Sequence, residues 1–287
     1  MMGEVVLLAC SDAREKDDKT EIAELRKIIE GYGLDVSCSS YLYNNLASGR
    51  EKAEEFNAFI LKKGLLAVMD VSGGNVANEM LPYLNYKAIA DSPVVFFGYS
   101  DLTTIINAIY AKTGKASVLY QARHLVGNEE RQREMGELLA DIYNSGQDKP
   151  DHQAYAICDL TKQAYHFIRG NELKGTVIGG NLRCFLKLAG TGYMPDVADK
   201  VLLMEALGGD LMSVRSMLSQ LSQLGVFERI KGVIAGTFTA LEKQGHYDRF
   251  IELLCSYVPE NVPIVTTREV GHDRSAKGIW IGKEIEI

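Results

Sequence analysis

The chain has 287 residues, which is long enough to bury roughly three quarters of its unfolded surface and to form about two domains. Its formal net charge of −7 disfavours nucleic acid or an anionic membrane as the main partner. The five cysteines are an odd number without C-x-x-C spacing, which argues against a disulfide framework and against a zinc site. No apolar run approaches the length of a membrane span, and Val5–Cys10 is too short for a signal peptide, so we expect a soluble cytoplasmic protein.

The first half of the chain alternates short apolar runs with segments of helical periodicity. The spacing of Ile22, Leu25 and Ile29 indicates one helix, and the Ser48-x-x-Glu51 pattern resembles a capping box at the start of another. Strand and helix alternate four times, which predicts a doubly wound, mostly parallel sheet with right-handed crossovers. The expected strands lie at residues 4–9, 34–38, 65–71 and 94–97, and the expected helices end near residues 31, 64, 84 and 114.

A serine stands where a predicted central strand meets the following helix. Val94–Phe97 is a continuous apolar run, typical of a strand buried on both faces, and Gly98 ends it. Ser100 then lies at the carboxyl edge of the sheet, where α/β proteins bind ligands and where the free N–H groups of a helix N-terminus can stabilise negative charge. A nucleophilic serine in acyl transfer needs this environment. Serine is also a favoured N-cap, so a purely structural role for Ser100 stays open.

A glycine pair follows the preceding predicted strand. Gly73 and Gly74 can adopt positive φ and approach a ligand closely, and their turn should open on the same sheet edge as Ser100. One of their N–H groups could face a developing oxyanion, although an ordinary turn between a strand and a helix would explain the pair as well. The pair lacks the spacing of a dinucleotide-binding or phosphate-binding loop, and we predict neither a cofactor nor a metal.

The second half of the chain has a different pattern. The polar segment 144–151 is rich in turn formers and marks the expected boundary between a first domain, residues 1–145, and a second domain, residues 152–287. Few helices are expected in the second domain, the main one from Ser213 to Leu224, so we predict a small β-rich α+β or barrel-like domain. Its expected strands lie at residues 153–158, 163–168, 175–179, 200–205, 232–235, 263–266, 278–281 and 284–287.

Two residues of the second domain are candidates for chemistry together with Ser100. Glu205 ends an apolar strand, where a buried carboxylate needs a partner, and His272 lies in a polar turn, where an imidazole can act as a base. An arginine or backbone N–H groups would serve Glu205 equally well, and His272 can also be a surface or structural residue. The order serine, acid, histidine is that of the α/β-hydrolases, but Leu102 replaces the second glycine of their G-x-S-x-G elbow.

Several short motifs follow one another along the chain. The block Gly98–Thr103 has the sequence G-Y-S-D-L-T, and the others are Gly73–Asn75 with Leu81–Leu84, Gly179–Leu182, Met217–Leu221 and Gly271–His272. In order and separation they resemble the motifs of the LD-carboxypeptidase family of serine peptidases, over almost the whole chain. The G-Y-S-D-L-T block is the most specific of them.

The resemblance implies a fold and an activity. The family combines an N-terminal flavodoxin-like or class I amidotransferase-like α/β domain with a C-terminal β-rich, barrel-like domain, and its members commonly form homodimers. They cleave the amide bond between an L-centre and a terminal D-amino acid in muropeptides, small peptide substrates of cell-wall recycling. The implied catalytic triad is Ser100, Glu205 and His272. We further expect an oxyanion hole from the N–H groups of Gly74 and Asp101, and substrate contacts from Gly73, Asn75 and Asn181.

Departures from the family pattern leave the substrate open. Ser72 stands where many members carry arginine, and residues 211–216 and 273–277 lack the usual patterns. One alternative is the activity of a related branch, the microcin C self-immunity peptidases, which hydrolyse aminoacyl-nucleotide conjugates. The single Trp280 gives little support for an aromatic nucleotide clamp. A second alternative, of another class, is a non-catalytic flavodoxin-like ligand-binding protein in which Ser100 caps a helix.

Overall fold

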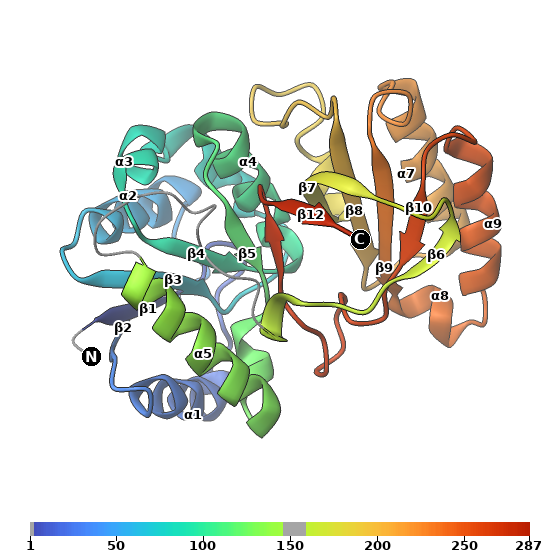
Figure 1. The fold of residues 1–287 in the computed structure, drawn as a ribbon. Coiled ribbons are helices and arrows are strands. Elements are labelled where there is room, and N and C mark those ends of the chain that lie inside the picture. The colour runs from blue at the N-terminus through green and yellow to red at the C-terminus, as the bar shows by residue number, and fades with distance from the viewer. Residues whose placement is uncertain (1–2, 146–158) are drawn as a thin grey trace.

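Two six-stranded sheets stand side by side in the computed structural model, which describes residues 3–145 and 159–287 (Figure 1). Five strands of the first sheet come from the N-terminal half of the chain and the sixth from its C-terminal end, whereas the second sheet is built entirely from the C-terminal half. The expected boundary segment, residues 144–151, extends beyond the described residues, and the strand expected at residues 153–158 lies outside them.

The first sheet has the strand order β11-β5-β4-β3-β1-β2, and its first five strands in sequence run parallel. The order 2-1-3-4-5 is that of flavodoxin, so the predicted flavodoxin-like fold is confirmed. The central strands β1, β3 and β4 are short and almost entirely buried because helices cover both faces of the sheet, whereas the edge strand β2 is partly exposed. The strands are β1 Glu4–Leu8, β2 Asp35–Cys38, β3 Leu65–Asp70, β4 Val95–Gly98, β5 Ser117–Leu119 and β11 Ile279–Ile281.

Helices pack on the two faces of this sheet according to the alternation of side chains along its strands. Residues such as Val5 and Phe97 share a core with α1 and α5, whereas Val6 and Phe96 share another with α2, α3 and α4. The five helices are α1 Lys19–Glu30, α2 Gly49–Ile60, α3 Tyr86–Asp91, α4 Thr103–Thr113 and α5 Glu129–Ser145. The capping box predicted at Ser48 is confirmed, since Glu51 N–H donates to its hydroxyl.

The second sheet has the order β12-β7-β8-β9-β10-β6 and curls into a half-barrel, which confirms the predicted barrel-like domain. The four central strands are parallel, and β12 and β6 are antiparallel edges. Its strands are β6 His166–Arg169, β7 Lys174–Asn181, β8 Lys200–Ala206, β9 Gly232–Phe238, β10 Ile264–Thr266 and β12 Glu284–Glu286. Its helices are α6 Leu182–Leu186, α7 Leu211–Gln223, α8 Thr239–Lys243 and α9 Tyr247–Tyr257.

The structure differs from the sequence prediction in several elements. Helices α8 and α9 occupy a stretch to which no helix was assigned, although Tyr247, Phe250 and Leu254 form the buried stripe of an amphipathic helix. The segment expected as a helix up to residue 84 is a 3-10 helix, Ala77–Tyr83, and contains Pro82. Strand β11, expected in the second domain, pairs with β5 and completes the first sheet.

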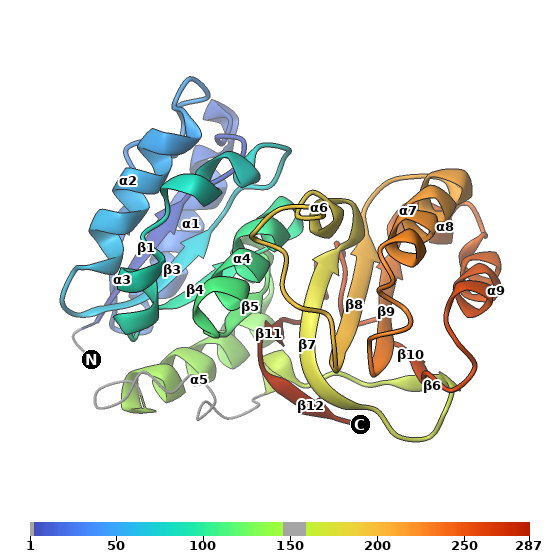
Figure 2. The same ribbon diagram turned by 90° about the horizontal axis from the view of Figure 1, so that it is seen from above.

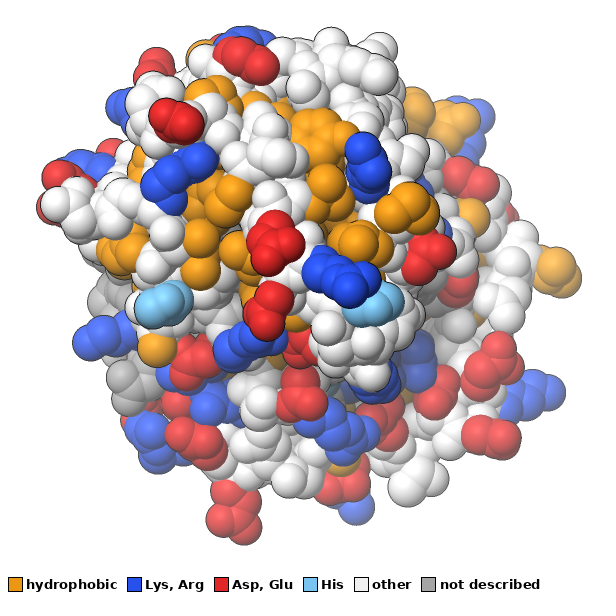
Figure 3. Space-filling model, turned by 90° about the vertical axis from the view of Figure 1, so that its right-hand side faces the viewer, with side chains coloured by type: hydrophobic (Ala, Val, Ile, Leu, Met, Phe, Trp, Pro, Cys, Tyr) orange, Lys and Arg blue, Asp and Glu red, His pale blue; other side chains and the backbone are white. Residues whose placement is uncertain are grey.

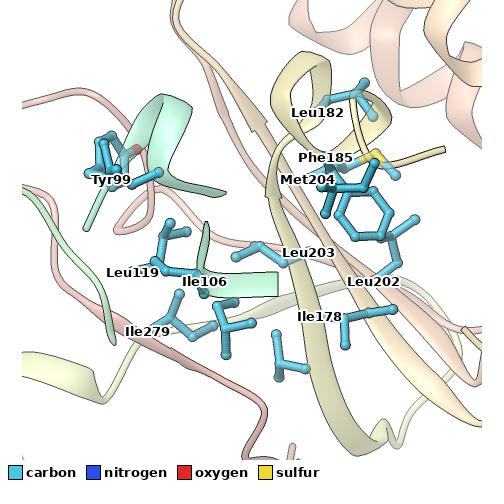
Figure 4. Close-up of a cluster of buried hydrophobic side chains, with 14 of the residues drawn as sticks. Tyr99, Ile106, Leu119, Ile178, Leu182, Phe185, Leu202, Leu203, Met204 and Ile279 are labelled. Atoms are coloured by element: carbon cyan, nitrogen blue, oxygen red, sulfur yellow. The ribbon is translucent and has the colours of Figure 1, made fainter. Parts of the chain in front are cut away.

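The two sheets share a continuous hydrophobic core. Helix α4 lies between them (Figure 2), and its Ile106 belongs to the same cluster of buried residues as Leu203 of β8. In Figure 4, Tyr99 (just after β4), Leu119 of β5 and Ile279 of β11 lie on one side of the core, and on the other lie second-domain residues Ile178, Leu182, Phe185, Leu202, Leu203 and Met204. The two halves are therefore packed against each other through apolar side chains, and this packing fixes how residues from different domains meet at a site.

One face of the second domain carries a mixture of side chains. Figure 3 shows hydrophobic side chains gathered in its upper part, with acidic and basic side chains interspersed among them and dominating below. Charges of both signs therefore share this face. Among the described helices, none combines the length and the apolar composition needed to cross a membrane.

Candidate active site

Ser100 stands in a strained turn at the carboxyl end of β4. Its φ is 56°, in the left-handed region that costs a non-glycine residue free energy and is common at functional sites. Gly98 makes the turn possible, because a Cβ there would lie 2.7 Å from the Cβ of Leu102. Ser100 is inside the 3-10 turn Ser100–Leu102, and the N-cap of that turn is Tyr99. It is therefore not the N-cap serine that the sequence left open.

Ser100, His272 and Glu205 form two consecutive contacts that connect the two domains. The Nε2 atom of His272 is 3.2 Å from Ser100 Oγ, and its Nδ1 atom is 2.8 Å from Glu205 Oε2. The second distance is that of an ion pair, although the Nδ1–H direction is not aligned for a hydrogen bond. Catalytic hydrogen bonds in unliganded enzymes are often misaligned in this way and tighten when substrate binds.

Glu205 is completely buried at the end of β8 and is held by polar partners. The hydroxyl of Tyr99 donates to its Oε2 at 3.1 Å, and the amide of Asn181 donates to its Oε1 at 3.0 Å. Burial, and secondarily the charge of Glu205, raises the pKa of Tyr99 well above its usual value, so this hydroxyl stays protonated and remains a donor. The Tyr99 ring also contacts the His272 ring edge to face, with 4.8 Å between centroids. Tyr99 thus positions both partners of the serine.

Asp101, directly after the serine, connects the turn to the glycine-rich loop. Its buried carboxylate accepts hydrogen bonds from the Ser11 hydroxyl at 2.7 Å and from the Ala77 N–H at 2.9 Å, and it pairs with Lys187, the C-cap residue of α6. The Ser11 hydroxyl in turn accepts from Val76 N–H at 3.2 Å. A buried charge with several partners holds its surroundings in one arrangement. The loop after β3 is thereby fixed relative to Ser100.

Two backbone N–H groups of the site lack a hydrogen-bond partner in the part of the chain that the structure describes. Within the described residues, the N–H groups of Gly74 and Asp101 have no hydrogen-bond acceptor. Gly74 has a φ of 135°, and a Cβ there would collide with the carboxylate of Asp12, so this position requires glycine. These are the two groups expected from the sequence to form an oxyanion hole.

A cleft of about 910 Å³ lies in front of Ser100. Asn75 and Asn181, two of the predicted substrate contacts, line it, whereas Gly73 is not among its lining residues. The side chain of Asn181 is engaged by Glu205 and by capping α6, and that of Asn75 accepts a hydrogen bond from Arg183. The remaining walls come from the loop after β8 and from α7, with lining residues Ala206, Leu207, Gly208, Gly209, Met212, Ser213, Ser216 and Met217.

Polar contacts also connect the two domains beside the site. Thr103, in the first turn of α4, accepts through its hydroxyl from the N–H of Asn181 at 3.0 Å. One turn further on, the amide of Asn107 bonds both the N–H and the carbonyl of Gly179. Both contacts are buried. The helix that begins at the serine is thereby attached to the strand beside the one that carries the acid.

Other reactive groups near the site are inactive or absent from the described structure. Burial raises the pKa of the Cys184 thiol to about 12, so it is not a nucleophile at neutral pH. Among residues 3–145 and 159–287, no cluster of three or more histidine, cysteine or acidic side chains could hold a metal ion.

A serine, a histidine and a buried carboxylate in this sequence of contacts, at the carboxyl edge of a flavodoxin-like sheet, are the arrangement of serine hydrolases. Comparison with known families agrees with this class. Residues 5–121 match the LD-carboxypeptidase N-terminal domain, and residues 174–287 match the LD-carboxypeptidase C-terminal domain. The chain belongs to the LD-carboxypeptidase family, as the motifs indicated.

Its relatives differ in their described roles. A candidate carboxypeptidase of Vibrio cholerae is 30% identical over 246 residues, which cover 77% of this chain and 72% of that protein. The microcin C7 self-immunity protein of Escherichia coli is 23% identical over 261 residues, covering 83% of this chain and 75% of its own length. Among solved structures, that protein bound to glutamyl sulfamoyl guanosine superposes with a TM-score of 0.81 at 20% identity, over 99% of this chain and 92% of the other.

A muramoyltetrapeptide carboxypeptidase from Oxalobacter formigenes shares the same fold. It superposes with a TM-score of 0.73 at 18% identity, over 99% of this chain and 94% of the other. Because both solved relatives have the same two-domain architecture, the fold does not decide between their substrates.

Three residues of the site were not singled out from the sequence. Tyr99 lies inside the G-Y-S-D-L-T block, so its proximity to the serine was visible, but its contact with Glu205 depends on the fold. Arg183 directly follows the Gly179–Leu182 motif, and a cationic residue next to this motif was a sequence signal for a site residue. Asn107 gave no sequence signal, because its role depends on the approach of β7.

Proposed function

We propose that this protein is a serine carboxypeptidase that hydrolyses an L,D-amide bond and releases the terminal D-amino acid of a muropeptide. The observation that carries the proposal is the series of contacts from Ser100 through His272 to the buried Glu205, with Ser100 lining a cleft large enough for a short peptide. Membership of the LD-carboxypeptidase family supports the same reaction.

In this mechanism the hydroxyl of Ser100 attacks the scissile carbonyl carbon while His272 Nε2 accepts its proton. The protonated imidazole then gives that proton to the leaving amine, which departs as the free D-amino acid. Glu205 holds the Nδ1–H tautomer and stabilises the imidazolium. A water molecule deprotonated by His272 hydrolyses the acyl-serine and restores the enzyme. Positioned proton transfer of this kind contributes typically about 10²- to 10⁴-fold to the rate.

The negative charge on the carbonyl oxygen requires donors that are already in place. The N–H groups of Gly74 and Asp101 serve as the oxyanion hole in this proposal, because Asp101 directly follows Ser100, Gly74 lines the same cleft, and neither N–H has an acceptor within the described structure. One such donor is worth roughly 3 to 4 kcal/mol of transition-state stabilisation. The hydrogen bonds that Asp101 accepts from Ser11 and Ala77 keep the glycine loop in position.

The decisive experiment is mass-spectrometric detection of D-alanine released from L-Ala-D-Glu-diamino acid-D-Ala, with wild type and Ser100→Ala compared side by side. We expect release by wild type and a loss of at least about 10³-fold in the variant, which should keep its folding stability because only one oxygen atom is removed. Near wild-type turnover by purified Ser100→Ala would show that the nucleophile is another residue.

A second candidate reaction is the hydrolysis of an aminoacyl-nucleotide conjugate. The similarity in fold to the microcin C7 self-immunity protein supports this second candidate. Against it, no aromatic side chain is among the described residues that line the cleft, and Trp280 is buried in β11 of the first sheet. An aminoacyl sulfamoyl adenosine offered in the same assay distinguishes the two reactions. Labelling of Ser100 by a fluorophosphonate addresses the non-catalytic alternative, since an unactivated serine should not react.

A further inference from the structure

Helix α6 presents a basic side chain to the cleft. Arg183 is exposed and lines the same cleft as Ser100 and Gly74. It is the only charged residue among the described residues that line this cleft. An exposed arginine is most often a solvated surface charge with little energetic effect. The contacts around Arg183 indicate a more specific role.

The guanidinium of Arg183 is held in place by the loop that carries the expected oxyanion donor. Its Nη1 donates to Asn75 Oδ1 at 2.8 Å, and its Nη2 donates to the Gly74 carbonyl at 3.3 Å. Nη2 also lies 4.0 Å from the sulfur of Cys184, a weak acceptor. A guanidinium has five N–H donors, so several remain for a ligand. The side chain is therefore oriented before any substrate arrives, which lowers the entropic cost of binding.

No carboxylate neutralises this cation within the described part of the chain. No aspartate or glutamate there forms an ion pair within 4.0 Å of Arg183, whereas Lys187, the C-cap residue of α6, pairs with the buried Asp101. The carboxylate of Asp12 lies beside the loop itself. It accepts from the N–H of Asn75 at 3.4 Å and lies against Gly74, without an ion pair to Arg183. A fixed, unneutralised guanidinium favours an anionic ligand with two oxygens.

The position of Arg183 suits one particular group of a bound peptide. Its guanidinium binds the carbonyl of Gly74, so it lies one peptide unit from the N–H expected to face the scissile oxygen. In a peptide, the terminal carboxylate carbon is separated from the preceding carbonyl carbon by the nitrogen and Cα, a span of about 3 to 4 Å. A substrate with its last amide bond at Ser100 would therefore bring its carboxylate to this region of the cleft.

We propose that Arg183 binds the free C-terminal carboxylate of the substrate and so restricts cleavage to the last amide bond. This inference rests on the proposed carboxypeptidase function. Leu207 and Met212, which line the same cleft and are exposed by 53% and 59%, accept the apolar part of the peptide. The substrate class is a short peptide with a free, anionic terminus, and a peptide blocked at that terminus is a poor substrate.

The test compares the tetrapeptide L-Ala-D-Glu-diamino acid-D-Ala with its C-terminal carboxamide. Because the contact is bidentate and charge-assisted, we expect the kcat/KM of wild type to be roughly 10- to 100-fold higher for the acid than for the amide. Most of this difference should come from a lower KM for the acid. Arg183→Gln should abolish this preference, and Arg183→Lys should restore part of it. The matched control is Arg215→Gln, which removes the same charge from an exposed position of α7 that does not line the cleft, and it should keep the preference.

Binding to the Ser100→Ala protein, measured by calorimetry with the same two peptides, separates this inference from the proposed function. Suppose that wild type releases no D-alanine, but Ser100→Ala binds the peptide acid more tightly than the amide and Arg183→Gln in the same protein removes this difference. The proposed reaction would then be wrong, and the proposed carboxylate site would be right. An acid-to-amide ratio that Arg183→Gln leaves unchanged overturns the inference. So does a failure of the Ser100→Ala protein to bind the peptide acid.

Discussion

The side-chain amide of Asn107 bonds the backbone of Gly179 through both of its polar atoms. Its Nδ2 donates to the Gly179 carbonyl at 2.8 Å, and its Oδ1 accepts from the Gly179 N–H at 2.9 Å. Asn107 is on the helix that begins behind Ser100, and Gly179 is on the strand that pairs with the strand carrying Glu205. This contact links the nucleophile's helix to the second domain.

We predict that Asn107→Ala lowers both stability and turnover. The substitution leaves the buried N–H and carbonyl of Gly179 without these partners, which should cost about 1 to 3 kcal/mol in the free energy of unfolding, measured by urea denaturation. Turnover should fall further than the stability loss explains, because the helix behind Ser100 can shift relative to β7. Asn57→Ala is a matched control, since Asn57 bonds the backbone of Tyr83 and Asn85 in a more exposed place far from the second domain. Equal turnover of both variants would contradict this linkage.

Tyr99→Phe should reduce turnover without unfolding the protein. It removes the hydroxyl that donates to Glu205 but keeps the ring against His272, so a buried carboxylate loses one of its donors. A hydrogen bond to a charged group is worth about 1.5 to 3 kcal/mol, and we expect a loss of roughly tenfold or more in kcat. Tyr86→Phe, which removes the hydrogen bond from that hydroxyl to the Leu81 carbonyl, is the control and should leave kcat unchanged. Unchanged kcat in Tyr99→Phe would show that Asn181 and His272 suffice to hold Glu205.

The stability of the protein should decrease as the pH falls from about 6.5 to about 4. Burial, and secondarily the nearby charges of Arg123, His272 and Arg274, lowers the pKa of His124 from 6.5 to about 4. Between pH 6.5 and about 4, the unfolded chain therefore binds a proton at His124 whereas the folded protein does not. The contribution of His124 to the free energy of unfolding is fully present above pH 6.5 and is lost as the pH falls through this range. Allowing for partial exposure, its size is about 2 kcal/mol.

Urea denaturation of wild type and His124→Gln at steps between pH 7 and pH 4.5 measures this contribution. The difference in unfolding free energy between the two proteins should change with pH over that range. The other groups that titrate there are common to both proteins, so this change reports on His124. A difference that is independent of pH would show that His124 becomes protonated in the folded protein as readily as in the unfolded chain.

Local sequence determined most of the first domain. The strand, turn and helix around Ser100 follow from the apolar run Val94–Phe97, from Gly98, and from helical periodicity that ends at Gly114, which adopts the left-handed conformation as the helix C-cap. The four alternations of strand and helix predict the parallel sheet, because a right-handed crossover leaves few other topologies. These signals act between neighbours in sequence, so they can be read without the fold.

Only the tertiary structure decided which distant residues meet. Ser100 and His272 are 172 positions apart, and their contact depends on the packing of two sheets through a shared core. Strand β11 joins the first sheet, and β12, which begins three residues later, joins the second. The chain passes from one sheet to the other at Gly282, and the periodicity of the sequence does not predict this change. The physical reason is common to these cases: apolar side chains identify what is buried but not against what, since the hydrophobic effect has no direction. The pairing of Glu205 with His272 and Tyr99 is decided by that packing.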